Sequence, residues 1–284
     1  MTTTEVEKNP IPAQAGIGIR HVHFREMLER LPDIGWLEAH SENYFGDGGQ
    51  PLYYLEQLRA HYPLSLHGVG MSIGSASPLD QLHLKKLKKL CDRFEPGLVS
   101  EHLCWGRVGE YHLNELLPLP YTEESLVHVV KRIEEVQDFI GRRILIENLS
   151  SYLEYKHSSI SEWEFLAEIA SRSGCGILLD VNNIYVNACN HDFDPHRYIE
   201  AIPAEAIGEI HLAGFERRDG LLIDTHSRNV TDDVWDLYQF THDLAGPCPS
   251  LIEWDADIPE LDVLLEEAGK AQSILQGEKN AAVA

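Results

Sequence analysis

The segment CGILLDVNN, residues 175–183, shows most clearly how this chain is expected to fold. Its first part is a short, continuous apolar run, which is typical of a strand buried on both faces of a parallel sheet. Its last part carries the polar residues Asp180, Asn182 and Asn183. Apolar runs that end in metal-binding or proton-transferring side chains recur along the chain, at residues 15–20, 35–41, 63–69, 97–105, 142–149, 207–215 and 250–256.

Segments of helical periodicity lie between these runs. Ser77-Pro78 predicts a helix start before 78–94, because serine is a favoured N-cap and proline is favoured at the first helical position. Ser161-Glu162-Trp163-Glu164 predicts a capping box in front of the helix at 164–173. Strand and helix therefore alternate along the chain.

Eight strand–helix units predict the α/β class and a single-domain (β/α)8 barrel of the TIM type. An open, doubly wound sheet is the alternative. The length of 284 residues suits one barrel, which typically needs about 250. We expect one enzyme domain at 15–276, with flexible tails at 1–14 and 277–284 because both ends lack apolar periodicity.

The charge of the chain is strongly acidic. Lys and Arg number 23 and Asp and Glu 46, for a formal net charge of -23. Such a surface repels phosphate backbones and anionic membranes, so we expect neither nucleic acid nor membrane as a partner. The 5 cysteines form no CxxC pair, and the first residues lack the apolar core of a signal peptide. These features predict a reduced, cytoplasmic location.

The strand ends are rich in side chains that bind metals. In a barrel of this type the carboxyl ends of all strands meet at one mouth, so these side chains are expected to converge. A single strand-end histidine or glutamate is commonly structural, whereas coincidence at eight strand ends favours a site. The residues are His21, His23, Glu38, His40, Glu42, Asn43, His67, Glu101, His102, Glu147, Asn148, Asp180, Asn182, Asn183, His211, Glu253 and Asp255.

The donor types favour a cluster of metal ions. Carboxylates crowded into a buried mouth repel each other, and cations relieve that repulsion. Mixed imidazole and carboxylate ligands without cysteine suit iron, manganese or zinc. Glu147 and Asp180 could each bridge two ions. Asp224 and His226 alternate along a later segment and form a second constellation, for which a solvated loop is the alternative.

Several motifs, in this order, resemble those of the multinuclear non-heme iron-dependent oxidative enzymes, a family whose best-known member helps to make the copper-binding peptide methanobactin. The motifs are HGVGMSIG, VSEHLCW, ILIENLSSY, ILLDVNNIYVNA, EIHLAGF, IDTHS and LIEWD, and the resemblance covers about residues 15–256. It implies a barrel like that of xylose isomerase and two or three iron ions in mixed ferrous and ferric states. It also implies dioxygen as co-substrate and oxidation of cysteine residues in a ribosomally made precursor peptide. A small companion protein that presents the peptide is a further implied partner.

The resemblance also implies a ligand set. His67, His102 and Glu147 match the ligands of one iron. Glu147 would bridge to a second iron, held also by Asp180, His211 and Glu253, and we expect Glu147, Asp180 and His211 to be catalytic. The third site would be formed by Asn182, Asp224 and His226.

Two other functional classes compete with this interpretation. A metal-dependent sugar isomerase, or a hydrolase like endonuclease IV, would use a similar cluster of histidines and carboxylates with zinc, manganese or magnesium. The acidic surface argues against DNA as a substrate. A non-catalytic metal-binding or scaffold protein is the third possibility. Iron in the purified protein, and dioxygen uptake that depends on a peptide, separate the first interpretation from these two.

Overall fold

The computed structural model describes residues 10–277. Its centre is a closed barrel of parallel strands, ordered β1-β12-β9-β8-β7-β4-β3-β2. These are β1 Ala15–Gly18, β2 Trp36–His40, β3 Leu64–Gly68, β4 Leu98–His102, β7 Leu145–Glu147, β8 Gly176–Asp180, β9 Ile207–Leu212 and β12 Ser250–Ile252. Each predicted run contains one of them. The barrel prediction is confirmed, and the open-sheet alternative is wrong.

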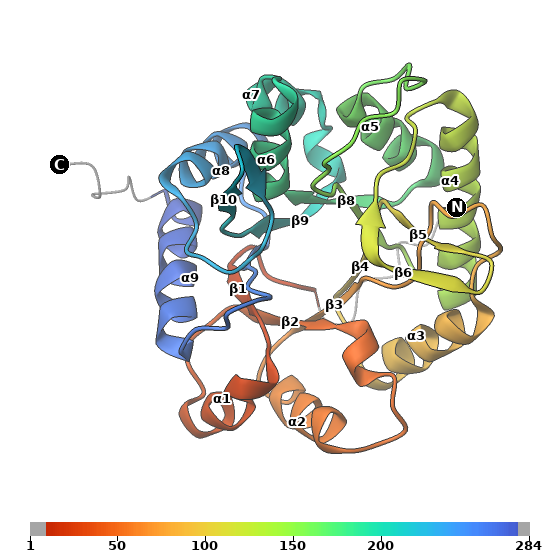
Figure 1. The fold of residues 1–284 in the computed structure, drawn as a ribbon. Helices are drawn as coiled ribbons and strands as arrows, with labels where there is room; N and C mark the ends of the chain where they lie inside the picture. The colour runs from red at the N-terminus through yellow and green to blue at the C-terminus, as the bar shows by residue number, and fades with distance from the viewer. Residues whose placement is uncertain (1–9, 278–284) are drawn as a thin grey trace, which may run out of the picture.

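Helices surround the strands (Figure 1). Within residues 10–277 they are α1 Phe24–Arg30, α2 Gln50–Arg59, α3 Gln81–Phe94, α4 Glu123–Ile140, α5 Glu162–Ser173, α6 Val181–His191, α7 Pro195–Ala201, α8 Asp232–Ala245 and α9 Leu261–Leu275, with 3-10 turns η1 His21–His23, η2 Ser41–Tyr44 and η3 Ala204–Ala206. The predicted tails at 1–14 and 277–284 lie mostly outside the described residues, so the domain boundaries stay a prediction.

The helices form because each carries an apolar stripe at helical spacing. In α4 the buried side chains recur every three or four residues and face the barrel: they are Leu126, Val129, Ile133, Val136 and Ile140. Thr122 caps the start of this helix by accepting from the backbone N–H of Ser125, and Gly141 ends it in the left-handed conformation. The same logic holds at α5, where the predicted capping box of Ser161 and Glu164 is present.

The strand register brings the predicted site residues together. His40 lies beside His67, His102 beside Glu147, and Asp180 beside His211 in directly paired positions of neighbouring strands. Side chains two residues apart on a strand share a face. His67 and His211 therefore point to the same side as Ser65 and Glu209, into the barrel.

One local prediction was wrong, and one element boundary lay inside a predicted run. Helix α3 begins at Gln81, not at Pro78, because the Asp80 carboxylate accepts from the backbone N–H groups of Leu82 and His83. The carbonyls of Ser77 and Pro78 accept instead from arginine side chains on α4 and β5. Within the run at 175–183 the strand ends at Asp180 and the remaining residues begin helix α6, which the Asp180 side chain caps.

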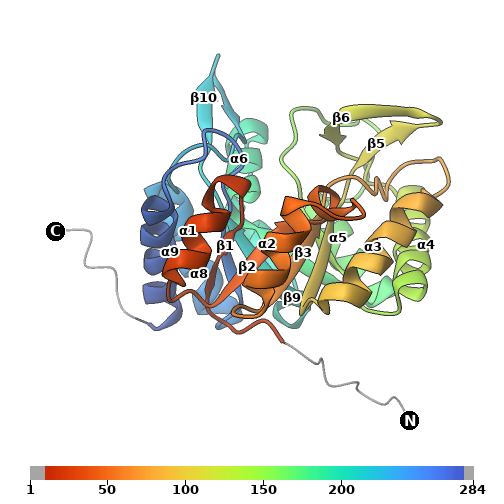
Figure 2. The same ribbon diagram turned by 90° about the horizontal axis from the view of Figure 1, so that it is seen from below.

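Two hairpins extend the barrel beyond what the sequence predicted. They are β5 Trp105–Val108 with β6 Tyr111–Leu117, and β10 Glu216–Arg218 with β11 Leu221–Ile223. Figure 2 shows β5, β6 and β10 projecting at the same end of the barrel. Both hairpins follow barrel strands, β4 and β9, so they stand at the carboxyl ends where the predicted site lies.

Two further observations concern membrane-spanning helices and cysteines. Among residues 10–277, no helix is both long and apolar enough to cross a membrane. The five cysteines are all unpaired; four are buried, whereas Cys189 is exposed.

A carboxyl outside the mouth gives a test of the folded state. Burial raises the pKa of Glu162 to about 7 from its ordinary 4.5, although Tyr198 and Tyr121 oppose the shift by donating hydrogen bonds to it. The folded chain thus binds this proton more tightly than the unfolded chain, so the stability contributed by Glu162 falls as pH rises from about 4.5 to about 7. Glutamine keeps the uncharged shape at every pH. In denaturant unfolding, we expect the free energy of unfolding of Glu162→Gln, relative to that of the wild type, to rise by about 1–3 kcal/mol between about pH 5 and about pH 8. A difference that stays constant with pH would contradict this assignment.

Candidate metal centre

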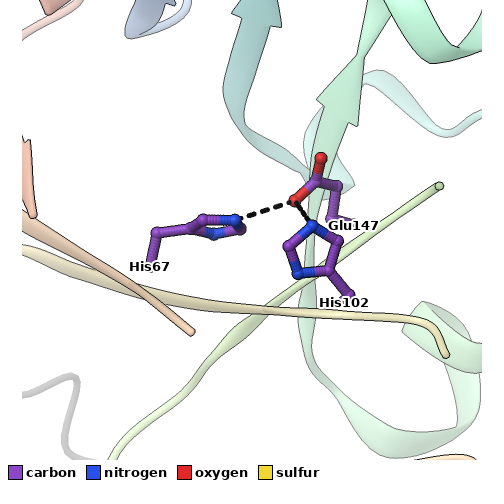
Figure 3. A group of neighbouring side chains, drawn as sticks. All are labelled: His67, His102 and Glu147. Atoms are coloured by element: carbon purple, nitrogen blue, oxygen red, sulfur yellow. Dashed lines mark ion pairs between the residues drawn. The ribbon is translucent and has the colours of Figure 1, made fainter. Parts of the chain in front are cut away.

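The first group of converging side chains joins three neighbouring strands. His67 lies near the end of β3, His102 ends β4 and Glu147 ends β7, and all are buried. The Nε2 atoms of both histidines lie 3.3 Å from Glu147 Oε2 (Figure 3). Three ligand-capable atoms within 4.8 Å of one another are close enough to share one cation.

The second group contains the same glutamate. Atoms of Glu147, Asp180, His211 and Glu253 lie within 4.8 Å of one another, and all four side chains are buried. Asp180 ends β8, His211 lies on β9, and Glu253 directly follows β12. The two groups share Glu147.

The third group comes from α6 and the segment after β11. Asn182 Nδ2 donates to Asp224 Oδ1 at 2.8 Å, and the same oxygen lies 2.6 Å from His226 Nε2. His226 Nδ1 is 3.3 Å from Glu253 Oε2, so this group adjoins the second. Asn183 Nδ2 donates to the carbonyl of Asn148. The three residues predicted for a third ion therefore lie together.

The Nδ1 atoms of His102 and His67, on the ring side away from Glu147, contact polar partners that orient the two rings. His102 Nδ1 must carry its proton, because it bonds to the Gly68 carbonyl at 3.0 Å, which can only accept. Ser100 Oγ holds His67 Nδ1 at 2.8 Å. In His102, Nε2 is left with its lone pair facing Glu147, as a metal ligand requires, and His67 presents the same nitrogen to Glu147.

The donors fit a cation better than they fit each other. His67 Nε2, Glu147 Oε2, Asp180 Oδ2 and Asn182 Oδ1 are all inaccessible to solvent and have no hydrogen-bond partner. Unsatisfied polar atoms are rare in protein interiors, since each costs free energy. Four of them around shared carboxylates are explained by ions held between them.

The pKa values of the clustered side chains also indicate a site for cations. Burial raises the pKa of Glu147 well above its ordinary value and that of Asp180 to about 7, while it lowers the pKa of His67. Glu253 behaves in the opposite way: burial works against its ionisation, but His226 and His211 outweigh burial and hold its pKa well below the usual range. A cation entering the centre would therefore displace protons.

The groups open into a cavity of about 400 Å³. Its walls include His40, His102, His226 and Glu253 from the centre, and residues 114–118 and 149–153 from the β6 end and the loop after β7. A ligand in this cavity would reach the first and second groups.

Other predicted strand-end residues lie elsewhere. His21 is exposed, and His23 bonds through Nε2 to the Pro259 carbonyl at 2.8 Å. Glu42 accepts from the backbone N–H groups of Val69 and Gly70, and Glu101 from that of Met71, so these two carboxylates anchor the loop after β3. Asn43 is exposed.

One buried carboxylate beside the centre was not predicted from the sequence. Glu209 Oε1 lies 3.5 Å from His211 Nε2, and its side chain is wholly buried. It precedes His211 by two residues on the same strand, and that spacing was the available signal.

Solved structures of low sequence identity share the fold. Endonuclease IV from Thermus thermophilus superposes with a TM-score of 0.61 at 13% identity, covering 93% of this chain and 98% of that one. D-allulose 3-epimerase from Methylomonas sp. gives a TM-score of 0.61 at 14% identity, covering 95% and 98%. Both likenesses concern the xylose isomerase-like barrel alone.

Closer relatives exist in sequence. A UPF0276 protein of Acaryochloris marina is 54% identical over 261 residues, covering 92% of this chain and 94% of the relative. Another, of Chromobacterium violaceum, is 50% identical over 267 residues, covering 94% and 96%. Residues 14–276 match the profile described as "RiPP precursor modification enzyme MbnB/TglH/ChrH", where RiPP denotes a ribosomally synthesised and post-translationally modified peptide. This chain therefore belongs to the MbnB/TglH/ChrH family of RiPP precursor modification enzymes.

Proposed function

We propose that this protein uses two or three iron ions and dioxygen to oxidise cysteine residues of a ribosomally made precursor peptide. The observation that carries the proposal is the sharing of Glu147 between two buried ligand groups at the mouth. Family membership supports the peptide as the class of substrate. When bound, iron supplies the redox chemistry with dioxygen that amino-acid side chains lack.

The protein's own contribution is placement. Glu147 would hold two adjacent cations, since it belongs both to the group of His67 and His102 and to the group of Asp180, His211 and Glu253. Asn182, Asp224 and His226 are the proposed ligands of a third ion. The depth of the cluster excludes bulk water from most ligand atoms, which strengthens the electrostatic attraction between ligand and cation.

The proposed partners follow from the mouth. A cysteine side chain of an extended peptide fits the cavity of about 400 Å³, whose rim includes the exposed apolar residues Tyr152 and Leu153. Among residues 10–277 the chain adds only hairpins and loops to the barrel, with no separate peptide-binding domain. We therefore include in the proposal a small companion protein that presents the peptide. We also propose the cytoplasm as the compartment.

Metal content is the first test. Protein made in iron-supplied cells is expected to hold at least two irons per chain by elemental analysis, because two complete ligand groups share Glu147. Zinc alone, with no activity restored by ferrous iron, would favour the hydrolase or isomerase interpretation.

Substrate is the second part of that test. We would express the chain together with a short cysteine-containing reading frame found beside its gene, and measure the peptide by mass spectrometry. The expected result is a mass change confined to a cysteine-containing fragment and dependent on dioxygen. An unchanged peptide in the presence of iron-loaded protein and the neighbouring companion would contradict the proposal.

A further inference from the structure

A second layer of ionisable side chains lies inside the barrel next to the centre. Glu38 on β2 and Glu209 on β9 have no solvent exposure, and neither does His211. Ligand-capable atoms of the three lie within 4.8 Å of one another. Neither carboxylate belongs to the ligand set proposed above, so their presence in the interior needs its own explanation.

The orientation of His211 supplies one. Its Nδ1 atom lies 3.0 Å from Glu253 Oε2, within the second ligand group. Its Nε2 atom lies 3.3 Å from Glu38 Oε2 and 3.5 Å from Glu209 Oε1. A neutral imidazole has one N–H and one lone pair, so it can give only one nitrogen to a metal while the other donates.

The two histidines of the first ligand group face the opposite way. His67 and His102 both turn Nε2 toward Glu147 and hold Nδ1 against Ser100 Oγ and the Gly68 carbonyl. In His211 it is Nδ1 that faces the centre, and Nε2 that faces the inner carboxylates. The ring is therefore reversed relative to its neighbours.

The inner carboxylates are suited to hold this reversed ring. Glu38 Oε1 and Glu209 Oε1 have no hydrogen-bond partner, and Glu209 Oε2 is fixed by a hydrogen bond of 3.2 Å from Ser65 Oγ. Burying two carboxylates is costly unless they receive donors. A cation placed between them instead would take the Nε2 lone pair and leave a proton on Nδ1, facing Glu253. The two arrangements exclude each other, and only the first leaves His211 free to serve the centre.

We propose that Glu209 and Glu38 are positioning residues that accept from Nε2–H of His211 and so make Nδ1 its metal-binding atom, whereas His67 and His102 bind through Nε2. The inference rests on the proposed function only in taking His211 as a metal ligand. Carboxylates that orient a ligating histidine commonly raise metal affinity about 10–100-fold.

Nuclear magnetic resonance of the zinc-loaded protein tests the ring directly. With 15N-labelled histidine, two-bond proton–nitrogen spectra distinguish a ring bound through Nδ1 from one bound through Nε2, and His211→Gln identifies the signals of His211. We expect Nδ1 binding for His211 and Nε2 binding for His67 and His102. Binding of His211 through Nε2 would overturn the inference while leaving the metal centre intact. No zinc effect on His211 would overturn both the inference and its place in the proposed centre.

Substitutions separate positioning from simple folding. Glu209→Leu removes one of the two acceptors and leaves Glu38 Oε2 at 3.3 Å from His211 Nε2. We therefore expect zinc affinity, measured by chelator competition, to fall about 10-fold, the lower end of the usual range, with partial loss of the His211 pattern. Glu209→Gln keeps an acceptor oxygen and should restore most of both. Glu162→Gln alters a carboxyl outside the centre and should change neither. Should Glu209→Leu not fold, Ser65→Ala, which frees Glu209 Oε2, should give a smaller change of the same kind. Wild-type zinc affinity and an unaltered His211 pattern in folded Glu209→Leu would refute the proposal. Because these measurements use neither iron nor peptide, they remain decisive even if peptide oxidation is not found.

Discussion

Glu147→Gln is expected to lose most of its bound iron and to lower peptide oxidation at least about 100-fold, equivalent to about 2.7 kcal/mol. The glutamate belongs to both ligand groups, so its replacement would remove one ligand from each proposed cation and the negative charge between them. The fold should survive. Burial raises the pKa of Glu147, so the neutral amide resembles the form that the metal-free protein favours. Circular dichroism of the metal-free variant should match the wild type.

Glu253→Gln is the matched comparison. Glu253 is buried at the same mouth but belongs to the second group and not to the first. Its replacement leaves the shared carboxylate in place, so this variant should retain more iron than Glu147→Gln. Should Glu147→Gln hold iron like the wild type and still consume dioxygen with substrate, Glu147 does not bridge.

Gly214→Ala is expected to disable the third group while leaving the first. Gly214 follows β9, and a Cβ atom there would lie under 3.0 Å from the backbone carbonyl oxygens of Arg228 and Asn229. That segment cannot retreat easily, because the buried Glu267 carboxylate holds the Asn229 side chain and the Val230 backbone N–H, each at 3.0 Å. The strain should shift the segment that carries Asp224 and His226. We expect a loss of about 1–3 kcal/mol in stability by denaturant unfolding and of roughly one metal ion per chain by elemental analysis.

Gly269→Ala is the control for this change. Gly269 lies in α9, and a Cβ atom there would meet no atom within 4 Å. Alanine inside a helix is favoured over glycine by about 0.5–1 kcal/mol, so this variant should be as stable as the wild type or more so, with full metal content. Equal metal content in the two variants would show that Gly214 does not control the third group.

The barrel was predictable because its strands are short, mostly apolar runs that alternate with helices. A run such as 175–179 buries every side chain, and few other structures accommodate that pattern. Boundaries were less predictable where one residue has two roles. Asp180 closes β8 and caps α6, so its side chain carried both a strand signal and a helix signal. The β5–β6 hairpin was hidden because its exposed strands alternate irregularly and bury little.

The residue types of the candidate site were predictable from the sequence, but which strand-end side chains face the barrel was not. The side chains of His67, His102, Glu147, Asp180, His211 and Glu253 meet as expected because parallel strands end together. Glu42 and Glu101 have the same residue type and strand-end position, yet they accept from backbone N–H groups of a loop. Sequence position alone does not distinguish a carboxylate that faces the barrel from one beside it. That difference depends on register, which only the three-dimensional pairing fixes.

The pairing of β1 with β12 has a consequence for the order of events during synthesis. The barrel closes only when the last strand, Ser250–Ile252, pairs with the first, Ala15–Gly18, and Glu253 directly follows that last strand. A nascent chain that has emerged only as far as β9 can already present His67, His102 and Glu147, but not the complete second group. Completion of the proposed centre thus waits for the final part of the chain. Binding of the full set of proposed ions therefore requires a closed barrel, and a ribosome-bound fragment that lacks β12 cannot hold all of them.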